Sequence, residues 1–205
     1  MNANRNLLSL LKDSNPFSSR ATRPGSMKYQ FLGEASPASL VASLQAQNWW
    51  GEIIGPHGSG KSTLLQSLRE PLEAAGRRVE QYTMHNDEKR LAVSGTVLKS
   101  WGPDTLVVVD GYEQLGGWNR SALKRICRQH GTGLLITAHE PAGLPVLYRT
   151  SVTLDLARTL VRELLPPGSD VVRDEDVSHS MDRWKGNLRE VFFELYDLYE
   201  SRRAN

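Results

Sequence analysis

The chain has 205 residues, of which 39% are hydrophobic and 23% are charged, and its formal net charge is +2. This composition is typical of a globular protein with one main domain and a small appendage, and it says little about partners. One cysteine, Cys127, excludes an internal disulfide and a cysteine-built metal site. No run reaches the roughly 18 apolar residues of a membrane-spanning helix, so we predict a cytoplasmic protein without membrane insertion.

Residues 1–30 form a polar N-terminal segment whose stretch "NPFSSRATRPGS" predicts irregular structure. The segment is basic, because only Asp13 opposes its positive charges, which belong to Arg5, Lys12, Arg20, Arg23 and Lys28. We interpret it as a solvated tail that packs against the domain. Contact with nucleic acid or an acidic partner is the alternative, and no specific motif supports it.

Residues 31–167 alternate between strands and helices. The predicted strands are "WWGEIIG" (49–55), "RRVEQYTM" (77–84), "DTLVVVDG" (104–111), "GLLITAH" (133–139) and "SVTLD" (151–155). The predicted helices cover 36–47, 61–75, 86–100, 119–130 and 156–165. The strands are apolar throughout, which indicates a parallel sheet covered on both faces. We therefore predict an α/β fold: a three-layer α/β/α sandwich around a mainly parallel five-stranded sheet.

The stretch "GPHGSGKSTLL" lies between the first predicted strand and the following helix, and it fits the pattern G-x-x-x-x-G-K-[ST]. Glycines allow successive N–H groups to turn inward around an anion, and a helix N-terminus favours negative charge. We predict an ATP phosphate site in this loop, with Lys61 on the β- and γ-phosphates and Ser62 on Mg²⁺. The binding residues are Gly55, Pro56, His57, Gly58, Ser59, Gly60, Lys61, Ser62 and Thr63.

Asp110 ends the most apolar predicted strand, about where ligands bind in open α/β sheets. We predict that its carboxylate holds Mg²⁺, directly or through water. The next residue is Gly111 rather than an acid, and Glu113 is the nearest carboxylate downstream. We predict Glu113 as the base that activates water, the alternative being a surface residue at the start of a helix.

The strand "GLLITAH" ends in Thr137, with His139 close behind. We predict Thr137 as a sensor of the γ-phosphate or of the attacking water, and His139 as a lesser candidate. This role implies that the strand lies between the phosphate-loop strand and the Asp110 strand.

Residues 168–205 change in character and predict a small, lid-like C-terminal helical element. Asn187 and Glu190 have the spacing of a helix-capping box. Arg189 then lies in the first helical turn, where a cation opposes the helix dipole, and this broken rule indicates a functional residue. We predict that Arg189 senses the γ-phosphate; pairing with an acid such as Asp182 is the alternative.

The order of the phosphate loop, Asp110, Thr137 and "GNLRE" resembles the AAA+ branch of the P-loop ATPases over roughly residues 49–200. The resemblance implies that Lys61, Ser62 and Thr63 bind phosphate and Mg²⁺, and that Thr137 and Arg189 act as sensors. The chain departs from the family in the missing acid after Asp110, a shorter lid and the lack of an identifiable arginine finger.

The leading functional hypothesis is a small AAA+-like ATPase that hydrolyses ATP with Mg²⁺ to drive a conformational change on a protein partner or on a second copy of itself. The alternatives are a P-loop small-molecule kinase and a nucleotide-dependent switch with little hydrolysis. No N-K-x-D motif for guanine is present, and the choice between ATP and GTP stays open.

Overall fold

The computed structural model describes residues 15–85 and 88–203, and the chain divides into two compact units. The sheet unit is Lys28–Ser151, and the helical unit combines Met1–Met27 with Val152–Asn205. Within the described residues, no helix is both long enough and apolar enough to cross a membrane. Residues 1–14, with Arg5, Lys12 and Asp13 of the predicted basic segment, lie outside the described residues.

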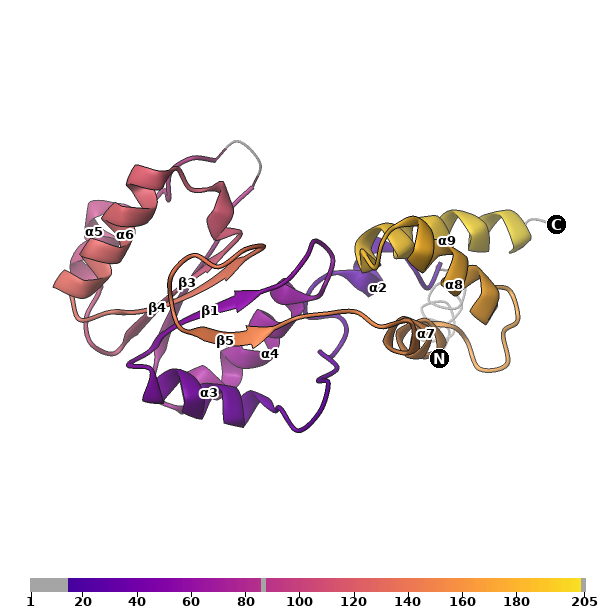
Figure 1. Ribbon diagram of the computed structural model, residues 1–205, viewed down its shortest axis with the longest axis horizontal. Helices are drawn as coiled ribbons and strands as arrows, with labels where there is room; N and C mark the ends of the chain where they lie inside the picture. Colours follow the sequence, from indigo (N-terminus) through magenta and orange to yellow (C-terminus); the bar gives the residue numbers. More distant parts are fainter. Residues whose placement is uncertain (1–14, 86–87, 204–205) are drawn as a thin grey trace, which may run out of the picture. The chain divides into compact units, whose positions relative to one another are not determined.

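The sheet unit is built on five parallel strands in the order β2-β3-β4-β1-β5 (Figure 1). The strands are β1 (Trp50–Ile54), β2 (Arg78–Thr83), β3 (Thr105–Asp110), β4 (Gly133–Ala138) and β5 (Val146–Arg149). The predicted α/β class is therefore confirmed. The predicted position of β4 between β1 and β3 is confirmed as well.

Every residue of β3 and of β4 is buried, because helices cover both faces of the sheet (Figure 1). Leu106, Val108 and Leu135 pack with the buried residues of α3 (Pro37–Ala46) and α4 (Lys61–Ala74), whereas Val107 and Val109 pack with those of α6 (Gly117–Gln129). Alternate side chains of one strand therefore enter opposite core clusters. The helices are α3 (Pro37–Ala46), α4 (Lys61–Ala74), α5 (Gly95–Ser100), η1 (Tyr112–Gln114) and α6 (Gly117–Gln129).

Helices α3 and α4 begin where the sequence predicts. The Ser36 side chain accepts a hydrogen bond from Ser39 N at 3.1 Å, and Pro37 occupies the first turn of α3. Helix α4 follows Gly60 and continues through Pro71. Its apolar stripe, which faces the core, comprises Leu64, Leu65, Leu68 and Leu72.

The fifth strand was predicted at the wrong place: β5 is Val146–Arg149, not 151–155. Its side chains alternate, with Leu147 buried and Val146 exposed, which is the pattern of a strand at the edge of the sheet. Thr153 instead caps the next helix, because its side chain accepts a hydrogen bond from Leu156 N.

The helix predicted over 86–100 is also shorter than expected. Of the described residues in this range, only Gly95–Ser100 is helical, and the Ser94 side chain caps this helix by accepting a hydrogen bond from Val97 N. Residues 86 and 87 lie outside the described residues. The segment before Ser94 lacks the regular apolar stripe that would hold a longer helix against the sheet.

The helical unit contains helices from both ends of the chain: α2 (Ser19–Thr22), α7 (Leu154–Leu164), α8 (Asp174–Arg183) and α9 (Leu188–Arg203). Its core includes Phe17, whose ring lies 6.2 Å from that of Phe192. Asn15 Nδ2 donates to Tyr196 O at 2.9 Å. Residues 15–27 and α7 thus belong to this unit, whereas the sequence indicated boundaries after residues 30 and 167.

Cys127 lies on the inner side of α6 and is fully buried in the core of the sheet unit. Burial raises the pKa of its thiol to about 12. This side chain therefore behaves as a small apolar core residue rather than as a nucleophile.

Candidate functional site

The phosphate loop joins the end of β1 to the start of α4, and its glycines are needed for its shape. Gly58 and Gly60 have φ values of 66° and 88°, which side-chain-bearing residues rarely adopt. A Cβ atom on Gly55 would lie 2.0 Å from Thr150 Oγ1. Thr150 Oγ1 also shares a 2.6 Å hydrogen bond with Ser59 Oγ, so the segment after β5 packs against the loop and supports it.

Lys61, the first residue of α4, folds back over this loop. Its Nζ donates to Gly55 O at 2.6 Å and to Pro56 O at 2.8 Å. Ser62 and Thr63 follow in the first turn, where an α-helix leaves its N–H groups without intrahelical acceptors. The N-terminus of a 14-residue helix, the glycine-rich loop and an ammonium group thus converge, which is the arrangement of an anion site.

Asp110 and Thr137 meet at the carboxyl ends of β3 and β4. Thr137 Oγ1 donates to Asp110 Oδ1 at 2.6 Å and accepts from Gly111 N at 2.9 Å. Thr137 is fully buried, and Asp110 is 9% exposed. The threonine hydroxyl therefore fixes the orientation of the Asp110 carboxylate.

The absence of an acid after Asp110 has a structural reason. Gly111 has a φ of 83°, and a Cβ atom there would lie 3.1 Å from Met84 O. A glutamate at this position would be both strained and crowded.

Glu113, His139 and His57 form a cluster beside the phosphate loop. Glu113 Oε1 lies 3.3 Å from His139 Nε2, and the His139 and His57 rings are 3.6 Å apart. Burial lowers the pKa of His139; Glu113 opposes this shift, while Lys61 and His57 add to it. Glu113 Oε2 is buried and has no hydrogen-bond partner in the part of the chain that the structure describes.

Arg189 belongs to the helical unit and lies in the first turn of α9. The predicted capping box beside it is not formed, because Asn187 Oδ1 is buried without a hydrogen-bond partner among the described residues. The sensor role of Arg189 remains a prediction.

The sequence analysis did not identify two buried polar residues, Thr150 and Glu52. Thr150 supports the phosphate loop, as described above. Glu52, only 1% exposed within β1, accepts hydrogen bonds from Ala142 N (2.9 Å) and Leu144 N (3.2 Å). Lys124 Nζ donates to Ala142 O at 2.7 Å, so the segment after β4 is held from both sides. The available signal was an acid within the apolar run "WWGEIIG".

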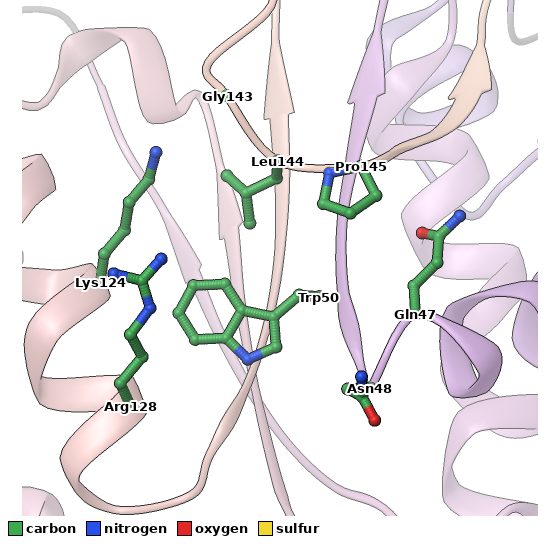
Figure 2. A pocket seen from close by; sticks show the side chains of 8 residues that line it. All are labelled: Gln47, Asn48, Trp50, Lys124, Arg128, Gly143, Leu144 and Pro145. Carbon is green, nitrogen blue, oxygen red and sulfur yellow. The ribbon is translucent and has the colours of Figure 1, made fainter.

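A cavity of about 330 Å³ lies away from the phosphate loop, near the start of β1 (Figure 2). The Arg128 guanidinium lies 5.2 Å from the centre of the Trp50 ring on one side of it. Its lining residues are Gln47, Asn48, Trp50, Lys124, Arg128, Gly143, Leu144 and Pro145. Because Trp50 is the first residue of β1 and the phosphate loop follows its last, cavity and loop are at opposite ends of this strand.

No family model matches the chain, and no curated protein matches it. Among solved structures, the Walker-type ATPase PABY2304 of Pyrococcus abyssi is similar, with a TM-score of 0.52 at 8% identity over 86% of this chain and 69% of that one. This similarity and the sheet topology define the class: the sheet unit has the fold of a P-loop NTPase.

Two further structures match with lower scores. PCH-2 of C. elegans has a TM-score of 0.36 at 13% identity, over 82% of this chain and 67% of that one. An E. coli MS115-1 HORMA:CdnC:Trip13 complex has a TM-score of 0.40 at 12% identity, over 70% of this chain and 68% of that one.

Proposed function

We propose that the protein is a Mg²⁺-dependent ATPase of the AAA+-like P-loop type. The observation that carries this proposal is the meeting of two features at the carboxyl edge of the sheet. One is the phosphate loop with Lys61. The other is Asp110 at the end of β3, whose carboxylate accepts a hydrogen bond from Thr137 on the neighbouring strand β4. This edge is the ligand side of an open α/β sheet.

The residues at this edge fit a magnesium ion. Mg²⁺ commonly takes one or two protein oxygens and completes its shell with water and substrate phosphates. Asp110 and Ser62 would supply those oxygens, and within the described residues Asp110 Oδ2 makes no hydrogen bond that would compete. No cluster of three or more His, Cys, Asp or Glu residues suited to a metal occurs in that part of the chain. Bound Mg²⁺ supplies charge neutralisation of the phosphates.

The chain's own groups would bind and orient the nucleotide. Loop N–H groups and the α4 N-terminus hold the β- and γ-phosphates, and Lys61 exchanges its two loop carbonyls for phosphate oxygens. Glu113 accepts a proton from the attacking water, because Gly111 leaves no acid directly after Asp110. Arg189 would report the γ-phosphate to the helical unit and so couple hydrolysis to motion on a protein partner or a second copy.

A nucleotide switch with little hydrolysis is the second candidate, and Gly111 is the observation that favours it. The glycine conformation and the nearby Met84 carbonyl exclude a base at the usual position. Under this alternative, ATP binds tightly and turnover stays close to zero.

Phosphate release from Mg²⁺-ATP tests the proposal. Wild type should release phosphate, Lys61→Ala should lose nucleotide binding and turnover, and Lys99→Ala, an exposed lysine of α5, should match wild type. Turnover per molecule that rises with protein concentration would indicate a site completed by a second copy. Tight binding without turnover would establish the switch instead, and equal turnover in Lys61→Ala would contradict both.

A further inference from the structure

The two oxygens of Glu113 lie in different environments. Oε1 is 3.3 Å from His139 Nε2, whereas Oε2 is buried without a protein partner among the described residues. A buried carboxylate oxygen without a hydrogen-bond donor is costly, so native sites supply one as water or ligand. Glu113 therefore has one oxygen restrained by His139 and one buried oxygen that a bound water would satisfy, since it still lacks a donor in the described part of the chain.

His139 is held in place from two sides. Its Nε2 faces Glu113, and the His57 ring of the phosphate loop lies 3.6 Å from its own ring, tilted by 55°. Because His57 lies within the phosphate loop, this ring contact joins His139 to the loop.

The charged and titratable groups that face His139 are Glu113 of η1, Lys61 of α4, His57 of the phosphate loop, and Glu140, the next residue in the sequence. Burial is the largest influence, and with Lys61 and His57 it lowers the pKa of His139 against the opposing carboxylates. His139 is then neutral near pH 7 and has one ring N–H. We assign this proton to Nε2, the nitrogen that faces the carboxylate.

We propose that His139 is a positioning residue that holds Glu113 through Oε1, so that Oε2 takes the proton of the attacking water. His57 links this pair to the phosphate loop. This inference rests on the proposed ATPase function. In the reaction, the water oxygen bonds to the γ-phosphorus, the bond from that phosphorus to the β–γ bridging oxygen breaks, and ADP leaves with the electron pair. The water proton passes to Glu113 Oε2 and is then released to solvent.

The arrangement predicts a specific pH dependence. Protonated His139 places a full positive charge beside Glu113 and weakens it as a base. Turnover should therefore fall as pH decreases through the lowered pKa of His139, below the usual histidine range. His139→Gln, which has a neutral amide donor at every pH, should lose the histidine contribution to this acid limb.

Steady-state kinetics of the full chain test the proposal. Glu113→Gln should lower kcat by about 100-fold or more, and His139→Ala by about 100-fold, with KM for ATP changed less than kcat. His139→Gln should restore much of the loss at pH 7.5. His130→Gln, at the C-cap of α6, and Glu70→Gln, on the exposed face of α4, are matched controls and should behave as wild type.

Binding of a fluorescent ATP analogue reports nucleotide affinity and circular dichroism reports folding, so together they separate the outcomes. Unchanged kcat in His139→Ala, or an unshifted acid limb in His139→Gln, would overturn the positioning role while leaving the ATPase intact. Wild type that binds the analogue without turnover would overturn both the role and hydrolysis. If wild type binds no nucleotide, the proposed function itself fails. A variant with an altered spectrum is replaced by His139→Asn, judged by the same criteria.

Discussion

The sheet unit and the helical unit bury their cores in different ways. In the sheet unit, β3 and β4 are buried along their whole length, and alternate side chains enter two separate clusters. In the helical unit, one cluster collects a stripe from each of α7, α8 and α9 together with Phe17, which is distant in sequence. Strand register thus positions polar groups such as Asp110 and Thr137, whereas the helical unit adds contacts from the other end of the chain, such as those of Phe17, to a cluster of consecutive helices.

The largest effect should come from removing one such contact. Phe17→Ala deletes a ring that is 1% exposed and packs against Phe192 and Tyr199. We expect a loss of about 3–5 kcal/mol from the free energy of unfolding of the helical unit. Hydrogen exchange should show faster opening of α7–α9 with β3 and β4 unchanged, and Phe193→Ala, at a half-exposed position of α9, should have little effect. Equal protection loss in both units would contradict the comparison.

Glu52→Ala instead removes a buried hydrogen-bond acceptor from the core of the sheet unit. It leaves the partly buried Ala142 N and the buried Leu144 N without their acceptor, and an unsatisfied buried group costs roughly 1–3 kcal/mol. We expect a loss of about 3 kcal/mol, read from chemical denaturation, with faster exchange around residues 140–145. Glu70→Ala, at an exposed position of α4, is the matched control. Wild-type stability in Glu52→Ala would show that these bonds do not hold the segment.

Thr137→Val tests whether the contact between β3 and β4 positions Asp110 in the candidate site. The substitution keeps the shape of the side chain but removes the bonds to Asp110 Oδ1 and Gly111 N. We expect a stability loss of about 1–2 kcal/mol and a fall in ATP turnover larger than the fall in nucleotide affinity. Thr83→Val, at the exposed end of β2, should leave both unchanged. Unaltered turnover in Thr137→Val would remove the threonine from the proposed site.

The smallest effect concerns the ion pair of Asp176 and Arg202 in the helical unit, joined at 2.6 Å and 2.9 Å. The hydrogen bond from Arg202 lowers the pKa of Asp176. The pair therefore contributes above the ordinary carboxyl pKa, and the contribution is lost as pH falls through the lowered value. Because both side chains are partly exposed, Arg202→Ala should cost only about 0.2–1 kcal/mol at pH 7 and less at pH 2. The bond from Arg202 to Val171 O does not depend on the Asp176 charge, so some of the cost remains in acid. Thermal melts at both pH values, compared with Arg20→Ala at an exposed position of α2, check this difference.

The sequence predicts the sheet unit well because its signals are local. Ser36 and Pro37 begin α3, and the apolar runs of β3 and β4 identify buried parallel strands. The edge strand β5 was misplaced because half of it is exposed and its short run resembles a loop. Helix α8 was not predicted, since its polar sequence buries only Val177, Ser180 and Met181.

The candidate site divides in the same way. The phosphate loop and Asp110 follow from spacing, since their residue types are tied to one local backbone shape. The contacts of Thr150 with Ser59 and of His139 with Glu113 join residues 91 and 26 positions apart in the sequence, and only the folded chain brings them together. Spacing along one sequence does not specify such contacts.

Cys127 lets the opening of the sheet unit be followed by chemical labelling. Its thiol is buried between α6 and the sheet and has a pKa of about 12, so a thiol reagent reacts only when that helix moves away from the sheet. Because the chain has one cysteine, every labelled molecule reports the same opening event. The labelling rate, measured with and without Mg²⁺-ATP, therefore reports how much nucleotide slows the opening of the sheet unit. The same measurement works in variants whose helical unit is unfolded.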